Sequence, residues 1–464
     1  MWSNTTTAFP FSLPGPPYNT EFSKKETHDI NLVVRRNIPQ GTIVLSGARI
    51  LTMDNRKVID NGDIVIKKGR ISCLGECDKS NADKIVDLKG KTIIPGLIDM
   101  HSHFYREYRG IIPMKTFEAS VPLAYGVTSN LDNSMWSQDV FPAAEMIEAG
   151  ALIGSRTYST GDPLYAGDGP RQNELTSYQI TEDNIKRLSS WGAVSLKQYM
   201  QPQRKQRQWV SDIARKYGLM VTSEGGDLNY NLSMIMDGQT AWEHPISYMP
   251  MYNDAAKFFG KAKTVYSPTF MVGGPGPWND EYFFAESKVW KNKKLRLWMP
   301  WQQLVPHSRR RELRPQTDYS YPFLAQVLAD IIAEGGHGAI GSHGQQHGIA
   351  SHWEVWVAAS AMGPMGALEL ATNEGAYFLG AQNDIGSLAK GKLADLIILN
   401  SNPLDDIKNT LDIEYVMKSG ILYDGFNLDE IWPQKKEYGK RPWINEDALI
   451  EDSRSINQWD KKEE

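Results

Sequence analysis

Hydrophobic positions along the 464-residue chain follow one pattern at both ends and another pattern between them. From residue 41 to 94, short apolar runs are separated by glycine, asparagine and aspartate turn signals, which is typical of β-strands. A second patch of this kind lies between residues 394 and 425. Because each patch is too small to bury a core by itself, we predict that the two ends pair into one small β-sandwich.

The segment between these patches alternates short apolar runs with longer amphipathic runs. Its strand-like runs are GLIDM, GVTSNL, RTYSTG, AVSLKQY, GLMVTS, TAWEH, KTVYSPT and HGAIGS. Amphipathic stretches such as ITEDNIKRLSSWG and RKQRQWVSDIARKYG lie between them and favour helices. Strand–helix units repeated in this way over roughly 280 residues predict an α/β fold of the (β/α)8 TIM-barrel type, with its chemistry at the carboxyl ends of the strands. A doubly wound open sheet is the alternative, but the first strand–helix turn lacks the G-x-G-x-x-G pattern.

The predicted organisation is therefore a barrel inserted into a split sandwich. Its parts are an N-terminal arm (1–40), a β-sandwich domain (41–94 and 381–432), a TIM barrel (95–380) and a C-terminal tail (433–464). The first twenty residues contain no lysine or arginine and no long apolar run, unlike a secretory signal. No run approaches the ~20 apolar residues of a membrane span. We therefore expect a cytoplasmic protein that does not bind membranes.

Composition narrows the function classes only slightly. The chain has 41% hydrophobic and 23% charged residues, close to the globular average, which excludes a largely disordered or fibrous protein. Its formal net charge of −5 gives no reason to expect a nucleic-acid partner. Only two cysteines, Cys73 and Cys77, are present. Two cysteines are too few for a scaffold held together by several disulfides or for a cysteine-rich metal site. We interpret both as small core residues.

The most specific local motif is PGLIDMHSHF, residues 95 to 104. His101 and His103 are two positions apart on a predicted strand, so both imidazoles project to the same side. One metal ion could accept a nitrogen from each at about 2.0–2.1 Å. Asp99, two residues earlier, could orient one of these ligands from behind. Two polar loop histidines are the alternative, but the preceding PG-(apolar)-D pattern at a strand end favours the metal site.

These residues, in the run GKTIIPGLIDMHSH, resemble the metal-dependent amidohydrolase superfamily. The run GSLAKGKLADLIILNSNPL and the β-strands split between the two chain ends extend the resemblance over about residues 41 to 425. More narrowly, RQRQW, TSEGGDLNYNLS, GSHGQQHG and HWEVW look similar to the amidohydrolase module of bacterial proteins that often carry a TolB-like propeller. The resemblance implies a TIM barrel that binds divalent metal and hydrolyses carbon–nitrogen bonds.

The superfamily pattern also implies a set of metal ligands. Lys197 stands at the end of the fourth strand, where the family has a lysine that reacts with CO2 to form a carbamate bridging two metals. Strand five usually ends in a histidine, whereas this chain has Glu224, with Asp227 just beyond. A carboxylate remains an acceptable zinc or manganese ligand. His244, in WEHP, matches the family's ligand on strand six.

Strand eight departs most from the family pattern. The superfamily usually has an aspartate there, which binds metal and takes the proton from water, but this chain has His343. His343 is predicted as a metal ligand or as the catalytic base, with His347 and His352 as second choices. Asp132, after strand two, is a further candidate catalytic residue that contacts substrate or a ligand histidine.

Residues 272 to 316 form an unusually long aromatic and basic connection. Such a segment favours a lid or substrate-binding loop, and an oligomer contact is the alternative. Trp278 and Trp298, together with Tyr199, are the predicted substrate-binding residues.

The resulting expectation is an amidohydrolase that uses a metal-activated hydroxide on an amide, cyclic amide or small peptide. Its cofactor would be Zn²⁺, Mn²⁺ or Fe²⁺, as one or two ions, and it would work as a homo-oligomer on small molecules. A deaminase or esterase on the same scaffold, or a non-catalytic oligomeric scaffold protein, are the alternatives.

Overall fold

The computed structural model describes residues 33–106, 110–166, 173–199, 201–246, 250–274, 276–304 and 313–444. Most of the predicted arm and tail lies outside these residues. From Arg36 onward the described residues form one compact unit. Within them, no helix combines the length and the apolar character needed to cross a membrane.

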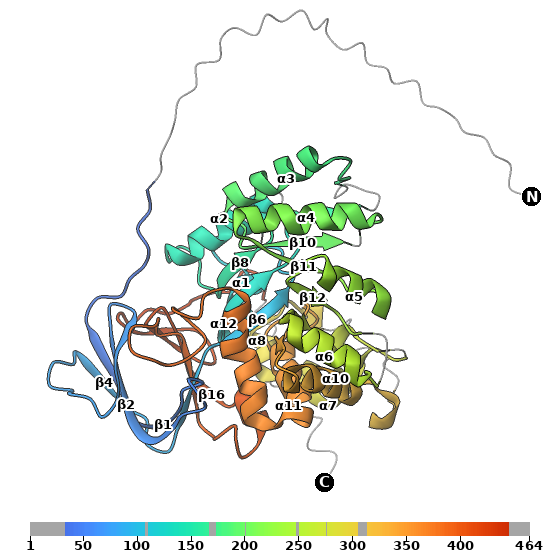
Figure 1. Ribbon diagram of the computed structural model, residues 1–464. Coiled ribbons are helices and arrows are strands. Elements are labelled where there is room, and N and C mark those ends of the chain that lie inside the picture. The colour runs from blue at the N-terminus through green and yellow to red at the C-terminus, as the bar shows by residue number, and fades with distance from the viewer. Residues whose placement is uncertain are drawn as a thin grey trace, which may run out of the picture. The chain divides into compact units, whose positions relative to one another are not determined.

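Strands from both ends of the chain share one nine-stranded sheet (Figure 1). The N-terminal strands are β1 (Thr42–Leu51), β2 (Val58–Lys67), β3 (Arg70–Gly75), β4 (Lys84–Asp87) and β5 (Thr92–Pro95). The C-terminal strands are β15 (Leu396–Leu399), β16 (Ile413–Lys418), β17 (Ile421–Asp424) and β18 (Glu430–Trp432). The order is β18-β17-β16-β15-β5-β1-β2-β3, with β4 beside β1. The two ends therefore share one sheet as predicted, while the β-sandwich arrangement and the domain boundaries stay predictions.

The antiparallel pair β5–β15 joins the two ends, with Ile93 opposite Ile398 and Ile94 opposite Ile397. All four side chains are fully buried. Because successive side chains on a strand point to opposite faces, Ile93 and Ile398 enter the sheet's own core. Ile94 and Ile397 instead pack into the large core shared with the helices. Both faces of this junction are thus apolar, which explains why these strands read as continuous hydrophobic runs.

Each of the eight predicted runs of the middle segment contains a strand. They are β6 (Leu97–Ser102), β7 (Val127–Asp132), β8 (Arg156–Ser159), β10 (Ser195–Tyr199), β11 (Met220–Ser223), β12 (Ala241–Glu243), β13 (Val265–Ser267) and β14 (His337–Gly338). With the short β9 (Leu164–Tyr165) they form three parallel sheets, β6-β7-β8, β9-β10-β11 and β12-β13-β14. The fold is accordingly a mixed α/β fold, and within each sheet the parallel strands place their carboxyl ends at the same edge.

Backbone hydrogen bonds connect these three sheets. The amide of Val194, before β10, donates to the carbonyl of Ser159 at the end of β8 (3.2 Å). Gly225, after β11, donates to the carbonyl of Glu243 on β12 (2.9 Å). On β6, the amide of Met100 donates to Ile340, just beyond β14 (2.9 Å). Each sheet is therefore bonded to the next, and the last is bonded to the first.

Helices follow most of the strands, as the amphipathic pattern predicted. They are α1 (Phe117–Ala124), α2 (Ser137–Glu148), α3 (Tyr178–Trp191), α4 (Arg204–Tyr217), α5 (Leu228–Met236), α6 (Asn253–Ala262), α7 (Asn279–Ser287), α8 (Lys293–Trp298), α9 (Trp301–Leu304), α10 (Tyr321–Ala333), α11 (Ile349–Glu369) and α12 (Gly375–Phe378). Local signals define their ends: Ser177 caps the start of α3 through the amide of Ile180, and the left-handed Gly192 ends it. The connection predicted as a lid contains α7, α8 and α9.

The interpretation of the two cysteines as separate core residues is wrong. Cys73, on β3, and Cys77 form a disulfide, and both side chains are only half-buried. Their Cα atoms lie 6.0 Å apart across the turn that follows the strand, within the range that a disulfide spans. The bond closes a local loop of the sheet, so it staples no distant parts of the fold.

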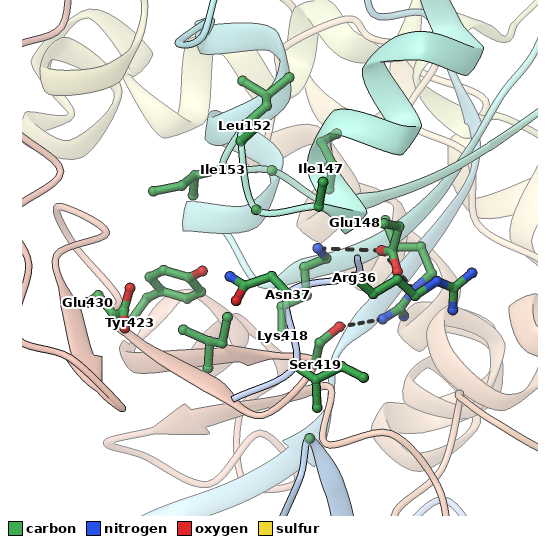
Figure 2. A pocket seen from close by; sticks show the side chains of 18 of the residues that line it. Arg36, Asn37, Ile147, Glu148, Leu152, Ile153, Lys418, Ser419, Tyr423 and Glu430 are labelled. Carbon is green, nitrogen blue, oxygen red and sulfur yellow. Dashed lines mark hydrogen bonds and ion pairs between the residues drawn. The ribbon is translucent and has the colours of Figure 1, made fainter. Parts of the chain in front are cut away.

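A buried group of charges connects the nine-stranded sheet to the middle segment. Arg156, on β8, forms ion pairs with Asp395 and with Glu148 (3.4 Å), and donates to the hydroxyl of Ser419 (2.7 Å). Lys418, at the end of β16, lies 3.6 Å from the same Glu148. Figure 2 shows the pair between Lys418 and Glu148 at the wall of a cavity of about 840 Å³. Charges buried this deeply need their partners, so the group fixes how the sheet meets β8.

We predict that Arg156→Met lowers the free energy of unfolding by about 3–5 kcal/mol, because it leaves the buried carboxylate of Asp395 without its counter-charge and removes one of the two cations beside Glu148. Urea unfolding followed by circular dichroism measures this loss. Arg49→Met is the matched control, since the pair between Arg49 and Asp60 is largely exposed (41% and 78% of the side chains) and should contribute little. Equal losses in the two variants would contradict the prediction.

Candidate metal centre

Four histidines meet at the carboxyl ends of the parallel strands. His101 lies on β6, His103 directly follows that strand, His244 directly follows β12, and His343 follows β14. Their ring centroids are 4.6–5.1 Å apart in the five ring contacts that join them. His101, His244 and His343 offer ligand atoms that all lie within 4.8 Å of one another. The structure thus brings together the four histidines that the sequence predicted as ligands.

Hydrogen bonds fix the tautomers of two of these rings. Nδ1 of His103 lies 2.9 Å from the carbonyl oxygen of Asn133, which can only accept, so this nitrogen carries the proton. Nδ1 of His244 lies 2.8 Å from the hydroxyl of Thr269, which itself donates to a main-chain carbonyl and therefore accepts from His244. In both rings the lone pair is on Nε2, as metal binding requires.

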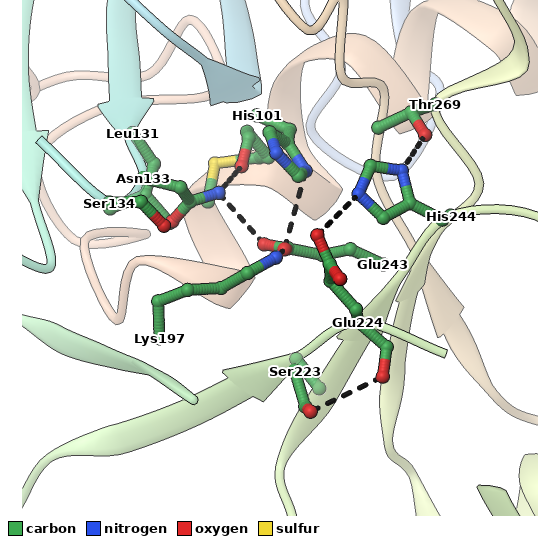
Figure 3. A network of polar contacts seen from close by, with 12 residues as sticks. His101, Leu131, Asn133, Ser134, Lys197, Ser223, Glu224, Glu243, His244 and Thr269 are labelled. Carbon is green, nitrogen blue, oxygen red and sulfur yellow. Dashed lines mark hydrogen bonds and ion pairs between the residues drawn. The ribbon is translucent and has the colours of Figure 1, made fainter. Parts of the chain in front are cut away.

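The lone pair of His244 faces another acceptor. Its Nε2 atom lies 3.6 Å from Oε1 of Glu224, the carboxylate that follows β11 (Figure 3). Nε2 of His101 lies 3.1 Å from Nε2 of His103, so two further ring nitrogens meet within the cluster. Acceptors that face one another inside a protein are satisfied by a cation between them. The donor set therefore fits a divalent metal ion.

Burial keeps the imidazoles of His101, His244 and His343 uncharged. It lowers the pKa of His101 well below its ordinary value, and the charges of Lys197 and the other histidines lower it further. Burial and the neighbouring imidazoles lower the pKa of His343 to about 2. Burial also lowers the pKa of His244. Neutral imidazole is the form that binds metal, so this part of the site needs no proton loss at neutral pH.

Lys197 lies beneath the histidines on β10 and forms a buried ion pair with Glu243, the last residue of β12. Oε2 of Glu243 also lies 3.4 Å from Nδ1 of His101, and its Oε1 accepts from the side-chain amide of Asn133 (2.8 Å). Burial lowers the pKa of Lys197 to about 7. Lys197 is therefore readily available as the neutral amine.

Sequence reasoning missed Glu243 and Asn133. Both are fully buried in the structure, and their side chains bond to each other. A signal for Glu243 was present in the sequence. It ends the apolar strand TAWEH directly before a ligand histidine, a position where burial is expected, and a buried glutamate needs a charged or hydrogen-bonding partner. Asn133 gave no such signal, since asparagine after a strand is typical of an ordinary turn.

Strained backbone marks the same strand ends. Positive φ angles occur at His244 (72°), His343 (57°), Thr269 (44°) and Ser134 (56°), none of which is glycine. A β-branched threonine in this region is especially unfavourable. Such conformations persist only where surrounding contacts enforce them, and they concentrate at functional sites. The main chain is thus held in the orientation that turns these side chains inward.

Asp99 supports the site from behind. Its Oδ1 atom accepts from the amides of His101 and Ser342 (both 3.1 Å), and Oδ2 accepts from the hydroxyl of Ser351 on α11 (2.9 Å). The carboxylate bonds to the main-chain amide of His101 and not to its imidazole. It therefore fixes β6 relative to the segment that carries His343.

The position of Asp132 does not support its predicted catalytic role. Its carboxylate is fully buried, pairs with Arg106 and accepts from the amide of Phe104 (3.3 Å). These contacts hold the chain that follows His103 against β7. Asp227 likewise has a structural contact, because it caps α5 through the amide of Tyr230.

The predicted substrate-binding residues lie in different environments. Trp298 is fully buried, donates its indole N–H to the carbonyl of Phe426 (2.8 Å) and packs under the guanidinium of Arg441. Its position therefore gives no support to a role in substrate binding. Trp278 is 52% exposed at the start of α7. The ring of Tyr199 lies 5.1 Å from Nζ of Lys197, which keeps it a candidate.

The alternative histidines have other partners. His347 packs against Phe104, with ring centroids 5.0 Å apart. His352 donates from Nε2 to the carbonyl of Tyr125 (2.8 Å), which identifies a structural residue. His28 and His307 lie outside the described residues.

Comparisons with known proteins agree with this chemistry. The model of the amidohydrolase family matches residues 325–422, about a fifth of the chain. A 5'-deoxyadenosine deaminase of Methanosarcina acetivorans is 31% identical over 109 residues, 23% of this chain and 22% of that protein. Adenine deaminase 1 of a Jannaschia species is 28% identical over 165 residues, 34% and 27% of the two chains. The matched segments thus span about a fifth to a quarter of the length of these curated relatives.

Solved structures share the fold over most of the chain. A Xaa-Pro dipeptidase with bound methionine has a TM-score of 0.63 at 21% identity and covers 82% of this chain and 100% of its own. A putative prolidase from Bifidobacterium longum has a TM-score of 0.65 at 21% identity and covers 90% and 100%. Together with the family match, these findings support the amidohydrolase superfamily and agree with the predicted enzyme class. The narrower resemblance to propeller-associated modules stays a prediction.

We predict that the metal-free protein loses stability as the pH falls from 7 to 5. His343 stays neutral in the folded state but takes up a proton near pH 6.5 when the chain is unfolded. Its contribution to the free energy of unfolding is therefore full above pH 6.5 and is lost as the pH falls toward its folded pKa of about 2. His343 alone accounts for roughly 2 kcal/mol at pH 5. Urea unfolding in the presence of a chelator at both pH values measures this loss.

His343→Asn is the control for this pH dependence, because asparagine does not titrate. Its free energy of unfolding should fall less between pH 7 and pH 5 than that of the wild type. Equal falls in the two proteins would show that His343 is not held neutral by the fold.

Proposed function

We propose that this chain is a metal-dependent hydrolase that cleaves a carbon–nitrogen bond in an amide, a cyclic amide or a small peptide. The observation that carries the proposal is the cluster of His101, His244 and His343, whose pKa values are lowered by burial and in which Nε2 of His244 faces the carboxylate of Glu224. The amidohydrolase family match supports the same reaction class. We further propose that the bonded parallel strands form a closed (β/α)8 barrel, which would place these residues at its mouth.

His101, His103, His244 and His343 would hold the metal, together with Glu224. Nitrogen ligands and one carboxylate favour Zn²⁺, with Mn²⁺ and Fe²⁺ as alternatives. Such an ion, when bound, lowers the pKa of water toward 7 and polarises a substrate carbonyl. The low pKa of His343 favours its role as a ligand over that of a base, because an efficient base has a pKa near the working pH.

Lys197 is proposed to become a carbamate. The neutral amine is the form that reacts with CO2, and burial lowers the pKa of Lys197 to about 7. The product is an anion with two oxygens, which could hold a second metal ion. In the uncarbamylated state Glu243 neutralises the lysine, so the site stays charge-balanced before metal binds.

Deamination is the second candidate function. The matched relatives named above include a 5'-deoxyadenosine deaminase and an adenine deaminase, whereas the similar solved structures include a dipeptidase and a putative prolidase. Both groups break a carbon–nitrogen bond, and they differ in the substrate that carries it. Amides and aminopurines are therefore both candidate substrates, and activity assays on each class distinguish them.

We expect the purified chain, reconstituted with Zn²⁺ or Mn²⁺ and bicarbonate, to hydrolyse at least one member of a panel of N-acyl amino acids, dipeptides, lactams and aminopurines. Chelation should abolish turnover, and metal should restore it. His101→Asn should lower kcat/KM at least 1000-fold and reduce metal content. A chain that binds less than about one equivalent of metal and turns over no panel member would instead favour the non-catalytic scaffold.

Lys197→Ala should reduce the bound metal from two equivalents to one or fewer, since the bridging carbamate is lost. Lys294→Ala is a matched control, because Lys294 is also buried with a pKa lowered to about 7, yet it donates to the carbonyl of Ala124 on α1. Metal analysis of both folded variants decides between the outcomes. Unchanged stoichiometry in Lys197→Ala would contradict the carbamate.

A further inference from the structure

The sequence motif HWEVW lies on the first two turns of α11, and the proposed function makes no use of it. Its glutamate, Glu354, is fully buried. Oε1 of Glu354 accepts a hydrogen bond from the backbone amide of Met271 (2.9 Å), in the segment that follows β13. A buried glutamate is rare unless a partner requires it, so this bond indicates a specific task for the side chain.

The amide that Glu354 binds lies at the start of a short helical turn. The turn comprises residues Phe270–Val272, and Thr269 directly precedes it. The first amides of a helical turn have no acceptor within the turn itself. Glu354 supplies the missing acceptor to Met271 from a different element of the fold. The start of the turn is therefore fixed to α11.

This turn positions the residue that orients a ligand histidine. The hydroxyl of Thr269 accepts from Nδ1 of His244 (2.8 Å) and donates to the carbonyl of Pro268 (2.8 Å) (Figure 3). Thr269 is fully buried, and its φ of 44° is unfavourable for a β-branched residue. Such a conformation persists only where neighbouring contacts enforce it. The bond from Met271 to Glu354, two residues further along the chain, is one such contact.

The same face of α11 also reaches the strand of His101. Ser351 lies three residues before Glu354, so both side chains project from one side of the helix. Ser351 donates to Oδ2 of Asp99 (2.9 Å), whose Oδ1 accepts from the amide of His101 (3.1 Å). This face of α11 thus holds the main chain near two ligand histidines, one through Ser351 and the other through Glu354.

The carboxyl of Glu354 borders a third ligand segment as well. Burial raises its pKa well above the ordinary value, and hydrogen bonds from the backbone oppose that rise, including one from Gly341. Gly341 lies two residues before His343 and packs so tightly that a side chain there would lie 2.6 Å from Cβ of His101. A single side chain on α11 therefore contacts the segments that follow both β13 and β14.

We propose that Glu354 is a positioning residue of the metal centre, which acts through the amide of Met271 to hold Thr269 where it orients the imidazole of His244. This inference rests on the proposed hydrolase function and adds a residue that shapes its site. Glu354 touches neither metal nor substrate in this role. What the role requires is an acceptor oxygen at the right reach, and the side chain of glutamine offers one too.

Two variants separate the reach of the side chain from its acid group. Glu354→Gln keeps the length and an acceptor oxygen, whereas Glu354→Asp keeps the acid but is one methylene shorter. Competition with a chelating dye measures the dissociation constant of Zn²⁺ for the full chain. We expect Glu354→Asp to weaken binding about 10–100-fold, as is typical when a group that orients a metal ligand is lost, and Glu354→Gln to stay within about threefold of the wild type.

Trp356→Phe is the matched control on the same helix. Its indole donates to the hydroxyl of Thr410 (3.1 Å), so the variant also loses one hydrogen bond of α11. This bond has no connection to Thr269 or Met271, and zinc affinity should stay at the wild-type value. A loss of affinity in Trp356→Phe equal to that in Glu354→Asp would show a general effect of helix stability and contradict the inference.

A second measurement needs no metal. Nitrogen NMR of chelator-treated protein labelled at histidine reports the tautomer of His244, whose signal is assigned by its absence in His244→Asn. The wild type and Glu354→Gln should carry the proton on Nδ1, where Thr269 accepts it, and Glu354→Asp should show a mixture of tautomers. The isosteric Glu354→Gln keeps the inference testable if Glu354→Asp does not fold, since a tenfold loss of affinity in Glu354→Gln would contradict it.

The outcomes separate this inference from the proposed function. If the wild type binds zinc and Glu354→Asp keeps both its affinity and its tautomer, the inference is wrong while the function stands. If the tautomer of His244 depends on Glu354 in a chain that binds no metal, the positioning role is supported and the proposed function fails.

Discussion

The candidate site depends on one buried carboxylate, that of Glu243. Lys197 pairs with it, Nδ1 of His101 lies 3.4 Å away, and the side-chain amide of Asn133 donates to it. Without this negative charge, a buried lysine would lie beneath a cluster of imidazoles with no counter-charge, at a cost of several kcal/mol. Because the carboxylate balances the lysine, His101, His244 and His343 can remain neutral while the four rings lie close together.

Strand geometry explains how residues far apart in the sequence reach one site. Each of the three parallel sheets contributes a side chain to the site at the carboxyl end of a strand: His101 from β6, Lys197 from β10, and His244 directly after β12. The backbone takes positive φ angles at His244 and His343, where the chain leaves its strand. This strain is maintained by the packed core behind the strands, so the rigid part of the fold determines the positions of the ligands.

Strands, amphipathic helices and histidine positions could be predicted because they follow local periodicity and a recognisable motif. All eight strand-like runs contain strands, and the four ligand histidines converge. Partners of buried charges could not be predicted in this way. Asp132 pairs with Arg106, and Trp298 packs against the C-terminal segment, because tertiary contacts decide where a polar or aromatic side chain is used. Glu243 was missed for the same reason, since its role depends on a lysine 46 residues earlier.

The central claim is that the clustered imidazoles form a metal centre. Anomalous X-ray diffraction from crystals of the zinc-loaded chain, recorded above and below the zinc absorption edge, tests it most directly. The account predicts an anomalous peak bonded to nitrogen atoms of His101, His244 or His343 at about 2.0–2.1 Å, and a second peak if Lys197 is carbamylated. A zinc peak elsewhere in the chain, or none at the histidines in crystals grown with excess zinc, would contradict it.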